Sequence, residues 1–236
     1  MTDELDFVAR YGMAKGFTFR PRTVLVEGTT DVELFQLAAR LEHKESGVNL
    51  LNNDIAVVAA GERDRGGTHG VIRELNALRQ MAQVCLLPDG RPRYRFIGLF
   101  DNDKAGKAAV KNAHVMDTSI LEYRDVFRLW PIMPLPGNLD TGSVQRAFEK
   151  ENASYKGLDW ELEDLLPQSF IEAFIGDHPS AISHTTLMGE KVHRDLTRDG
   201  KAHFHRYIKQ NAVHSDMNSV IHVIKAIRLY MNCPRQ

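Results

Sequence analysis

The chain has few of the features that mark secreted, zinc-binding or membrane-spanning proteins. It carries only two cysteines in 236 residues, Cys85 and Cys233, which lie far apart and show no metal-ligand spacing. This usage favours a reducing compartment and buried thiols over a disulfide framework. No apolar run approaches the ~18 residues that cross a membrane. The acidic start, Met-Thr-Asp-Glu-Leu-Asp, is unlike a secretory signal. We therefore expect a cytoplasmic protein that does not engage a membrane.

The chain also lacks an excess of charge of either sign. Its formal net charge is −1, so the overall balance does not indicate nucleic-acid binding, and any such binding must use local patches. No G-x-x-x-x-G-K-[ST] segment is present, which excludes a P-loop nucleotide site. The hydrophobic content of 43% and the charged content of 26% are ordinary values for a globular protein. The length is sufficient for one domain with an appendage.

The first informative segment is a short apolar strand that ends in acidic residues. Residues 23–26 are β-branched or apolar, as expected for a strand that is covered on both faces. Gly28 then allows a sharp exit, and residues 30–33 read Thr-Asp-Val-Glu, which fits a helix capping box. Ligands of parallel sheets bind just beyond the carboxyl ends of the strands. Glu27 stands at that end, and Asp31 stands beside it in the first helical turn.

A second segment repeats this pattern farther along the chain. Residues 96–100 are apolar, and Asp101 and Asp103 follow at a spacing that points both side chains to one side of an extended chain. Residues 105–114 then predict a helix, and residues 54–61 predict a further strand between the two acidic segments. Strands that alternate with helices predict βαβ units and a parallel sheet. The acidic residues would then meet at one edge of that sheet.

Four carboxylates at one edge of a sheet would repel one another strongly. Such a cluster is expected where a hard divalent cation neutralises it, because Mg²⁺ takes a few carboxylates and keeps waters that phosphate oxygens can replace. Such a metal can stabilise the attacking and leaving oxygens of a phosphodiester cleavage. The alternative is structural: Asp31 could be no more than a helix-capping carboxylate, and one Asp-x-Asp pair is a weak signal. Both segments together, on matching strand–helix units, favour the metal site.

The segments Glu27-Gly-Thr-Thr-Asp31 and Asp101-Asn-Asp103 resemble the motifs of the Toprim domain. That domain is shared by topoisomerases, bacterial primases, recombination proteins and the OLD (overcoming lysogenization defect) nucleases. The resemblance covers about residues 20–135 and implies an α/β fold, with a mostly parallel sheet, helices on both faces and Mg²⁺ chemistry on a phosphodiester. It implies that Glu27 is a metal ligand or general acid/base and that Asp101 and Asp103 are metal ligands. Asp31 matches an extra acid of the nuclease branch.

Two later segments are similar to further parts of the OLD nuclease site. The acidic run Trp-Glu-Leu-Glu-Asp-Leu-Leu-Pro resembles its Leu-Glu-x-x-Asp-Leu motif in shortened form. Glu163 is the best match to a metal ligand, and the spacing does not separate Glu161 and Asp164 from it. The alternative is a helix N-terminus enriched in acids. The segment Asp-Gly-Lys-Ala-His-Phe resembles a Gly-Lys-x-x-Phe-Ala segment, which implies that Lys201 stabilises charge on the scissile phosphate or orients water. The alternative for Lys201 is an ordinary exposed lysine.

Basic residues near the acidic segments are candidates for phosphate contacts. Lys104 and Lys107 lie on one face of the helix predicted after the second acidic strand. This helix begins directly after the predicted metal ligands, so its first lysines would lie next to the metal site. Arg63 and Arg65 lie in a glycine-rich loop. We expect these four side chains to bind the backbone of a nucleic acid.

Histidines crowd the C-terminal part of the chain. A zinc site is conceivable there, but no cysteine accompanies the histidines, and His203 and His205 would lie on different faces of a helix. We interpret the whole group as surface and packing residues, namely His178, His184, His193, His203, His205, His214 and His222.

The sequence thus predicts a Toprim-like catalytic core over residues 1–135 and a mainly helical region over residues 136–236 that completes the active site and could provide an interface. The predicted function is an endonuclease that uses one or two Mg²⁺ or Mn²⁺ ions on DNA or RNA, as an effector in anti-phage defence. OLD nucleases normally carry an ATPase region, and its absence here predicts either an autonomous nuclease or a subunit controlled by a separate ATPase sensor. A homo-oligomer is a further expectation. The rival is a non-catalytic Toprim-fold binding subunit of a nucleic-acid-processing or ATPase complex.

Overall fold

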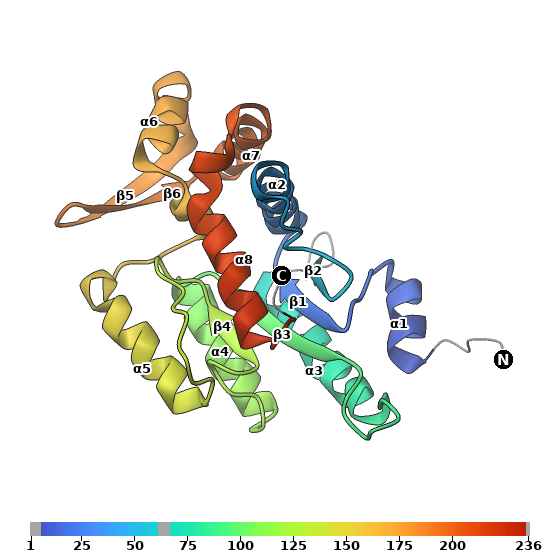
Figure 1. Cartoon of the computed structure of the whole chain (residues 1–236). Helices are drawn as coiled ribbons and strands as arrows, with labels where there is room; N and C mark the ends of the chain where they lie inside the picture. Colours follow the sequence, from blue (N-terminus) through green and yellow to red (C-terminus); the bar gives the residue numbers. More distant parts are fainter. Residues whose placement is uncertain (1–5, 61–66, 235–236) are drawn as a thin grey trace.

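Figure 1 shows the computed structural model, which describes residues 6–60 and 67–234. Four strands form the central sheet, in the order β2-β1-β3-β4, and all neighbours pair in parallel. Their bounds are β1 (Arg22–Val26), β2 (Ile55–Ala59), β3 (Arg95–Phe100) and β4 (Val126–Arg128). The predicted fold class, an α/β protein with a mostly parallel sheet, is confirmed.

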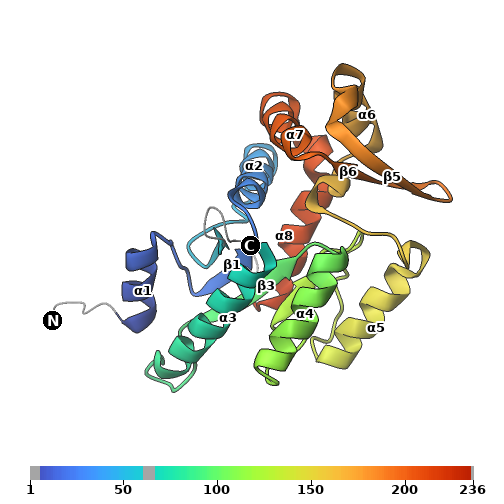
Figure 2. The same ribbon diagram turned by 180° about the vertical axis from the view of Figure 1, so that it is seen from behind.

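Helices cover both faces of this sheet because successive strand residues point to opposite faces. Val24 and Ile97 lie in one buried cluster and Leu25 and Phe96 in another. The first cluster includes side chains of α2 (Thr29–Ser46) and α8 (Asn218–Tyr230), and the second those of α1 (Phe7–Lys15), α3 (Gly67–Val84) and α4 (Lys104–Met116). Figures 1 and 2 show these two layers from opposite sides. Burial on both faces explains why the strands read as continuous apolar runs.

The region after residue 135 is mainly helical, as predicted, but it also contains a β-hairpin. Antiparallel strands β5 (Ile182–Met188) and β6 (Lys191–Leu196) extend away from the sheet (Figure 2). Gly189, with φ of +63°, forms the turn between them. The helices of this region are α5 (Thr141–Glu151), η1 (Ala153–Tyr155), η2 (Leu162–Leu165), α6 (Gln168–Asp177), η3 (Pro179–Ala181), α7 (Arg198–Asn211) and η4 (His214–Met217).

The C-terminal helix α8 returns to the central sheet. Its apolar side packs in the largest buried cluster, and the Tyr230 ring stacks on Phe127 of β4 with 4.8 Å between ring centroids. The Tyr230 hydroxyl donates a hydrogen bond to the Pro134 carbonyl. The core therefore contains side chains from both sides of the predicted boundary at residue 135, which itself stays a prediction. Among the described helices, none combines the length and the apolar character that crossing a bilayer would need.

Candidate functional site

Glu27 and Asp101 stand at the same edge of the sheet. Each is the first residue after its strand, and these strands, β1 and β3, are hydrogen-bonded parallel neighbours. Asp31 joins them from the first turn of α2, where its Oδ2 accepts a hydrogen bond from the Gly28 amide at 2.8 Å. The three carboxylates line one small cavity of about 20 Å³. Asp31 is therefore a helix cap and also a member of the acidic cluster.

The turn from β3 into α4 gives the two aspartates of the Asp-x-Asp pair different positions. Asp103 caps α4, because its Oδ1 accepts a hydrogen bond from the Gly106 amide at 2.7 Å. The helix approaches the strand end so closely that a Cβ at Gly106 would lie 1.8 Å from the Asp101 carbonyl oxygen. Only glycine fits there. Asp101 lines the cavity with Glu27 and Asp31, whereas Asp103 is the N-cap residue of α4.

The C-terminal region reaches this edge through Trp160. The Asn102 amide donates to the Trp160 carbonyl at 2.8 Å, and the Trp160 amide donates to the Asn102 carbonyl at 3.3 Å. Asn102 is itself held by Arg128 of β4, whose Nη1 donates to Oδ1 at 2.8 Å. These bonds hold the acidic run before and within η2 beside the Asp-x-Asp turn.

Helix α7 supplies partners for two acids of that run. Lys201 Nζ donates to Glu161 Oε2 at 2.8 Å, and His205 Nε2 lies 3.1 Å from Glu163 Oε1. Lys201 and His205 are four residues apart, so both project from one face of α7. The side chains of Glu163 and His205 are almost completely buried. The C-terminal region therefore brings a cation and an imidazole to the edge where Glu27 and the aspartates lie.

The third acid of the run, Asp164, turns away toward the hairpin. Its Oδ2 accepts a hydrogen bond from the Glu161 amide at 2.8 Å and lies 2.7 Å from His193 Nδ1 of β6. Burial lowers the pKa of His193, but the hydrogen bond and charge of Asp164 outweigh it and raise the pKa to about 9. Asp164 thus fixes η2 against the hairpin, whereas Glu161 and Glu163 face the sheet edge.

The acids at the sheet edge resist ionisation. Burial, followed by the charges of Asp31 and Asp103, raises the pKa of Glu27 to about 7. Burial and the charges of Glu163 and Asp31 raise the pKa of Asp101 well above its usual range. These shifts arise because several buried carboxylates lie close together. A carboxyl that titrates near neutral pH in a polar cleft is a candidate general acid or base.

Lys201 and His205 offset part of this negative charge. Burial alone would raise the pKa of Glu163, but the hydrogen bond from His205 and the charge of Lys201 lower it. In turn, burial disfavours the charged form of Lys201, and the charges of Glu163 and Glu161 more than compensate, so the pKa of Lys201 is raised. The lysine therefore keeps its charge inside the cluster, and Glu163 stays ionised beside it.

The donor atoms at this edge suit a hard cation. They are carboxylate oxygens, which Mg²⁺ and Mn²⁺ accept as ligands. Burial and neighbouring carboxylates raise the pKa values of Glu27 and Asp101, so a cation would favour the ionised forms of both. Among the described residues, no three acidic, histidine or cysteine side chains already stand close enough together to enclose a metal. A bound metal would therefore require these side chains to move closer together.

The predicted phosphate contacts differ in position. Lys104 and Lys107 are exposed on the first turns of α4, and Lys107 Nζ lies 2.7 Å from Asp159 Oδ1. Both lysines therefore lie on the helix that begins at the acidic edge. Arg63 and Arg65 lie outside the described residues.

Two of the histidines are packing residues beside the acidic run. His193 and His205 are both buried, and both contact carboxylates of the acidic run. The sequence contains a signal for His205, because the spacing of four from Lys201 places the two side chains on one helix face. It contains no comparable signal for His193, which lies in the unexpected hairpin.

Comparisons with known proteins add little to this picture. No family model and no curated protein matches the chain. One matching solved structure is the RNA polymerase domain of Mycobacterium tuberculosis primase DnaG, with 24% sequence identity and a TM-score of 0.27. The match covers 72% of this chain and 43% of the primase chain, so the chain spans less than half of that structure. A superposition of this quality does not bear on function.

Proposed function

We propose that this protein is a metal-dependent nuclease that hydrolyses phosphodiester bonds. The observation that carries the proposal is the acidic cluster at the carboxyl edge of the sheet, where Glu27, Asp31 and Asp101 meet Glu163 and Lys201 from the C-terminal region. Each member comes from a different element. A fold that only needed stability would gain little from gathering repelling charges there. The resemblance of two segments to the Toprim nuclease motifs supports the same conclusion.

In this proposal the carboxylates of Glu27, Asp31, Asp101 and Glu163 would hold one or two Mg²⁺ or Mn²⁺ ions. Asp103, the N-cap residue of α4, would be a further ligand. Such an ion supplies charge neutralisation for the attack of water on phosphorus. Glu27, whose pKa lies near 7, is suited to accept a proton from the attacking water. Lys201 would stabilise negative charge on the scissile phosphate. His205 would hold Glu163 in position, and Glu161 would hold Lys201.

The substrate would be DNA or RNA, with backbone phosphates held by Lys104 and Lys107 on α4. The physiological role would be that of an effector in anti-phage defence, which a separate ATPase sensor subunit controls. This role rests on the resemblance to OLD nucleases. The competing proposal is a non-catalytic binding subunit. It is favoured by one observation: Lys201 and His205 already pair with Glu161 and Glu163.

A cleavage assay distinguishes these proposals. Plasmid, linear DNA and RNA would each be incubated with the purified protein and Mg²⁺, Mn²⁺ or a chelator, with and without a candidate ATPase partner. We expect cleavage with either metal and none with chelator or with Asp101→Asn. The matched control is Asp89→Asn, since Asp89 is a surface acid whose carboxylate pairs with Arg91 at 2.6 Å. Cleavage by Asp101→Asn at the wild-type rate would reject the site, and metal binding without any cleavage would favour the binding subunit.

A further inference from the structure

The outer edge of β2 has no partner strand among the described residues. The Arg22 amide donates to the Asp54 carbonyl at 3.0 Å, and the Ala60 amide donates to the Val26 carbonyl at 2.9 Å. Backbone groups of successive strand residues point to alternate sides, so the even-numbered residues of this segment face β1. Ile55, Val57 and Ala59 therefore direct their N–H and C=O groups outward.

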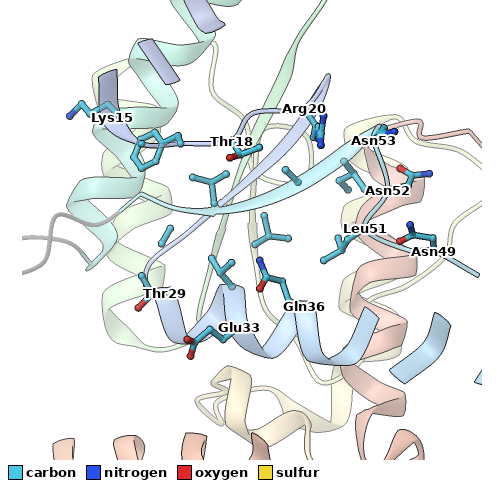
Figure 3. A pocket seen from close by; sticks show the side chains of 18 residues that line it. Lys15, Thr18, Arg20, Thr29, Glu33, Gln36, Asn49, Leu51, Asn52 and Asn53 are labelled. Carbon is cyan, nitrogen blue, oxygen red and sulfur yellow. The ribbon is translucent and has the colours of Figure 1, made fainter. Parts of the chain in front are cut away.

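A groove of about 860 Å³ follows this edge and includes both sides of the strand. Figure 3 shows Thr18 and Arg20 on one side of β2 and Gln36 and Asn49 on the other. The strand itself reads Ile-Ala-Val-Val-Ala, without a charge or a proline. Proteins usually protect an edge strand with lysine, proline, a bulge or a covering element. Ile55–Ala59 contains none of these among the described residues, so the outward N–H and C=O groups of β2 are available to another strand.

We propose that the partner is the β2 edge of a second copy of this chain, paired antiparallel about a twofold axis at Val57. In this register Val57 lies opposite Val57 of the partner subunit, and Ile55 lies opposite Ala59 of the partner subunit. Every one of these pairs joins two residues whose N–H and C=O groups face each other, which is the hydrogen-bonded pair of an antiparallel ladder. The apolar side chains of opposite residues also meet on one face. The two sheets join into one continuous sheet.

The charges on α2 fit the same axis. Gln36 lies beside the groove between Glu33 and Leu51 (Figure 3). The axis makes the two α2 helices antiparallel. With the axis level with Gln36, which lines the groove together with Val57, Glu33 lies opposite Arg40 of the partner subunit, and this ion pair occurs twice. Both side chains are exposed, and Glu33 keeps its contact with Lys209 at 2.6 Å. On the other side of the sheet Lys15 approaches Arg20 of the partner subunit, and its ion pair with Glu74 at 3.3 Å reduces that repulsion.

The mass of the full chain in solution tests this proposal. Sedimentation velocity over a wide range of protein concentration should show a monomer–dimer equilibrium. Val57→Pro removes one outward N–H group and leaves the β1 ladder intact, so it should yield a folded monomer. Val57→Lys should do the same. Val115→Lys, at an exposed position on α4, is the control and should leave the dimer unchanged. A wild-type protein that is monomeric at all concentrations overturns the proposal.

Charge reversal tests the register without altering the strand. Glu33→Arg alone and Arg40→Glu alone should each weaken the dimer, because each places like charges opposite one another. The double variant should recover wild-type dimerisation. A mixture of the two single variants should form the heterodimer in preference to either homodimer, since both of its α2 contacts are then opposite in charge. A dimer that none of these substitutions affects would lie on another surface and would also overturn the proposal.

Discussion

Lys201 of α7 donates a hydrogen bond to Glu161, the residue before η2, with 2.8 Å between Nζ and Oε2. The two residues are 40 positions apart, so the contact fixes α7 to the acidic run, which the backbone bonds of Trp160 to Asn102 hold beside the sheet edge. The charges of Glu163 and Asp101 also act on the ammonium group and help to raise the pKa of Lys201. Lys201 is therefore a fixed cation within a cluster of acids.

Replacing this cation should affect both activity and stability. Lys201→Met keeps much of the side-chain volume but leaves Glu161 and Glu163 without their cation. We expect turnover to fall by orders of magnitude and the free energy of unfolding to fall by about 1.5–3 kcal/mol, the range for a hydrogen bond to a charged group. Cleavage rates and urea denaturation measure the two effects. Lys209→Met, which breaks an exposed pair with Glu33, should change neither; unchanged turnover in Lys201→Met would remove the lysine from the proposed mechanism.

The raised pKa of Glu27 predicts a pH-dependent stability of the metal-free protein. Because the folded-state pKa of about 7 exceeds the ordinary 4.5, the folded state favours the protonated form. The stabilisation that the protonated Glu27 contributes is therefore fully present below pH 4.5 and is lost as the pH rises through about 7. Glu27→Gln should abolish this loss and stabilise the chelated protein by on the order of 2 kcal/mol above about pH 8. Thermal unfolding in chelator across this pH range is the measurement, and equal stability of both proteins at high pH would contradict it.

The strands and the acids at their ends were predictable because they depend on short-range patterns. The apolar run before Glu27 and the one before Asp101 each predict a buried strand, and parallel strands must share their carboxyl edge. The role expected for Gly28 was wrong: its φ of −124° is extended backbone that any residue adopts. Gly106 is the glycine that the site needs, and the reason is a tertiary contact that no local pattern reveals.

The C-terminal half of the site was less predictable because its contacts join segments far apart in the chain. The motif resemblance selected Glu163 and Lys201, but not the imidazoles beside them. His193 pairs with Asp164 only because the hairpin folds back onto η2, and the hairpin sequence has many polar and charged residues. Its strands lack a buried face, so their pattern is weak.

Metal binding should be visible as a change in stability. A ligand that binds only the folded state stabilises it by RT ln(1 + L/Kd), where L is the free ligand concentration, so the melting temperature rises with ligand concentration. A bound metal would also reduce the repulsion among the buried carboxylates. We expect Mg²⁺ or Mn²⁺ to raise the melting temperature of the wild-type protein and to leave that of Asp101→Asn unchanged. In chelator, Asp101→Asn should be the more stable of the two, because burial and neighbouring acids disfavour the charged form of Asp101. A wild-type protein that is insensitive to both metals would oppose a metal site.

The pair of His193 and Asp164 predicts a second pH dependence of stability. Here the folded state favours the charged form of the group, whereas for Glu27 it favours the neutral form. The folded-state pKa of His193 is raised from 6.5 to about 9, so this pair stabilises the protein below about 6.5 and its contribution is lost as the pH rises through about 9. His193→Gln should lower stability by about 3 kcal/mol at the acidic end of this range, because it leaves the Asp164 carboxylate without its charged partner. The difference between the two proteins should shrink as the pH rises. Urea denaturation at several pH values checks this, and a difference that is constant with pH would contradict it.

Lys107 allows the nucleic-acid contact to be separated from the chemistry. It lies on the first turns of α4, one turn from Lys104, and its ion pair with Asp159 is half-exposed and contributes little to stability. Lys107→Ala should weaken binding of DNA or RNA regardless of sequence and reduce the slope of log affinity against log salt by roughly 1, as expected for one lost phosphate contact. The measurement is fluorescence anisotropy in chelator, where the proposed metal-dependent cleavage would not occur. Lys111→Ala, on the next turn of the helix, gives a matched comparison, and its effect should be smaller because it lies farther from the acidic edge. If Lys107→Ala left both affinity and salt slope unchanged, the nucleic acid would approach the site from another direction.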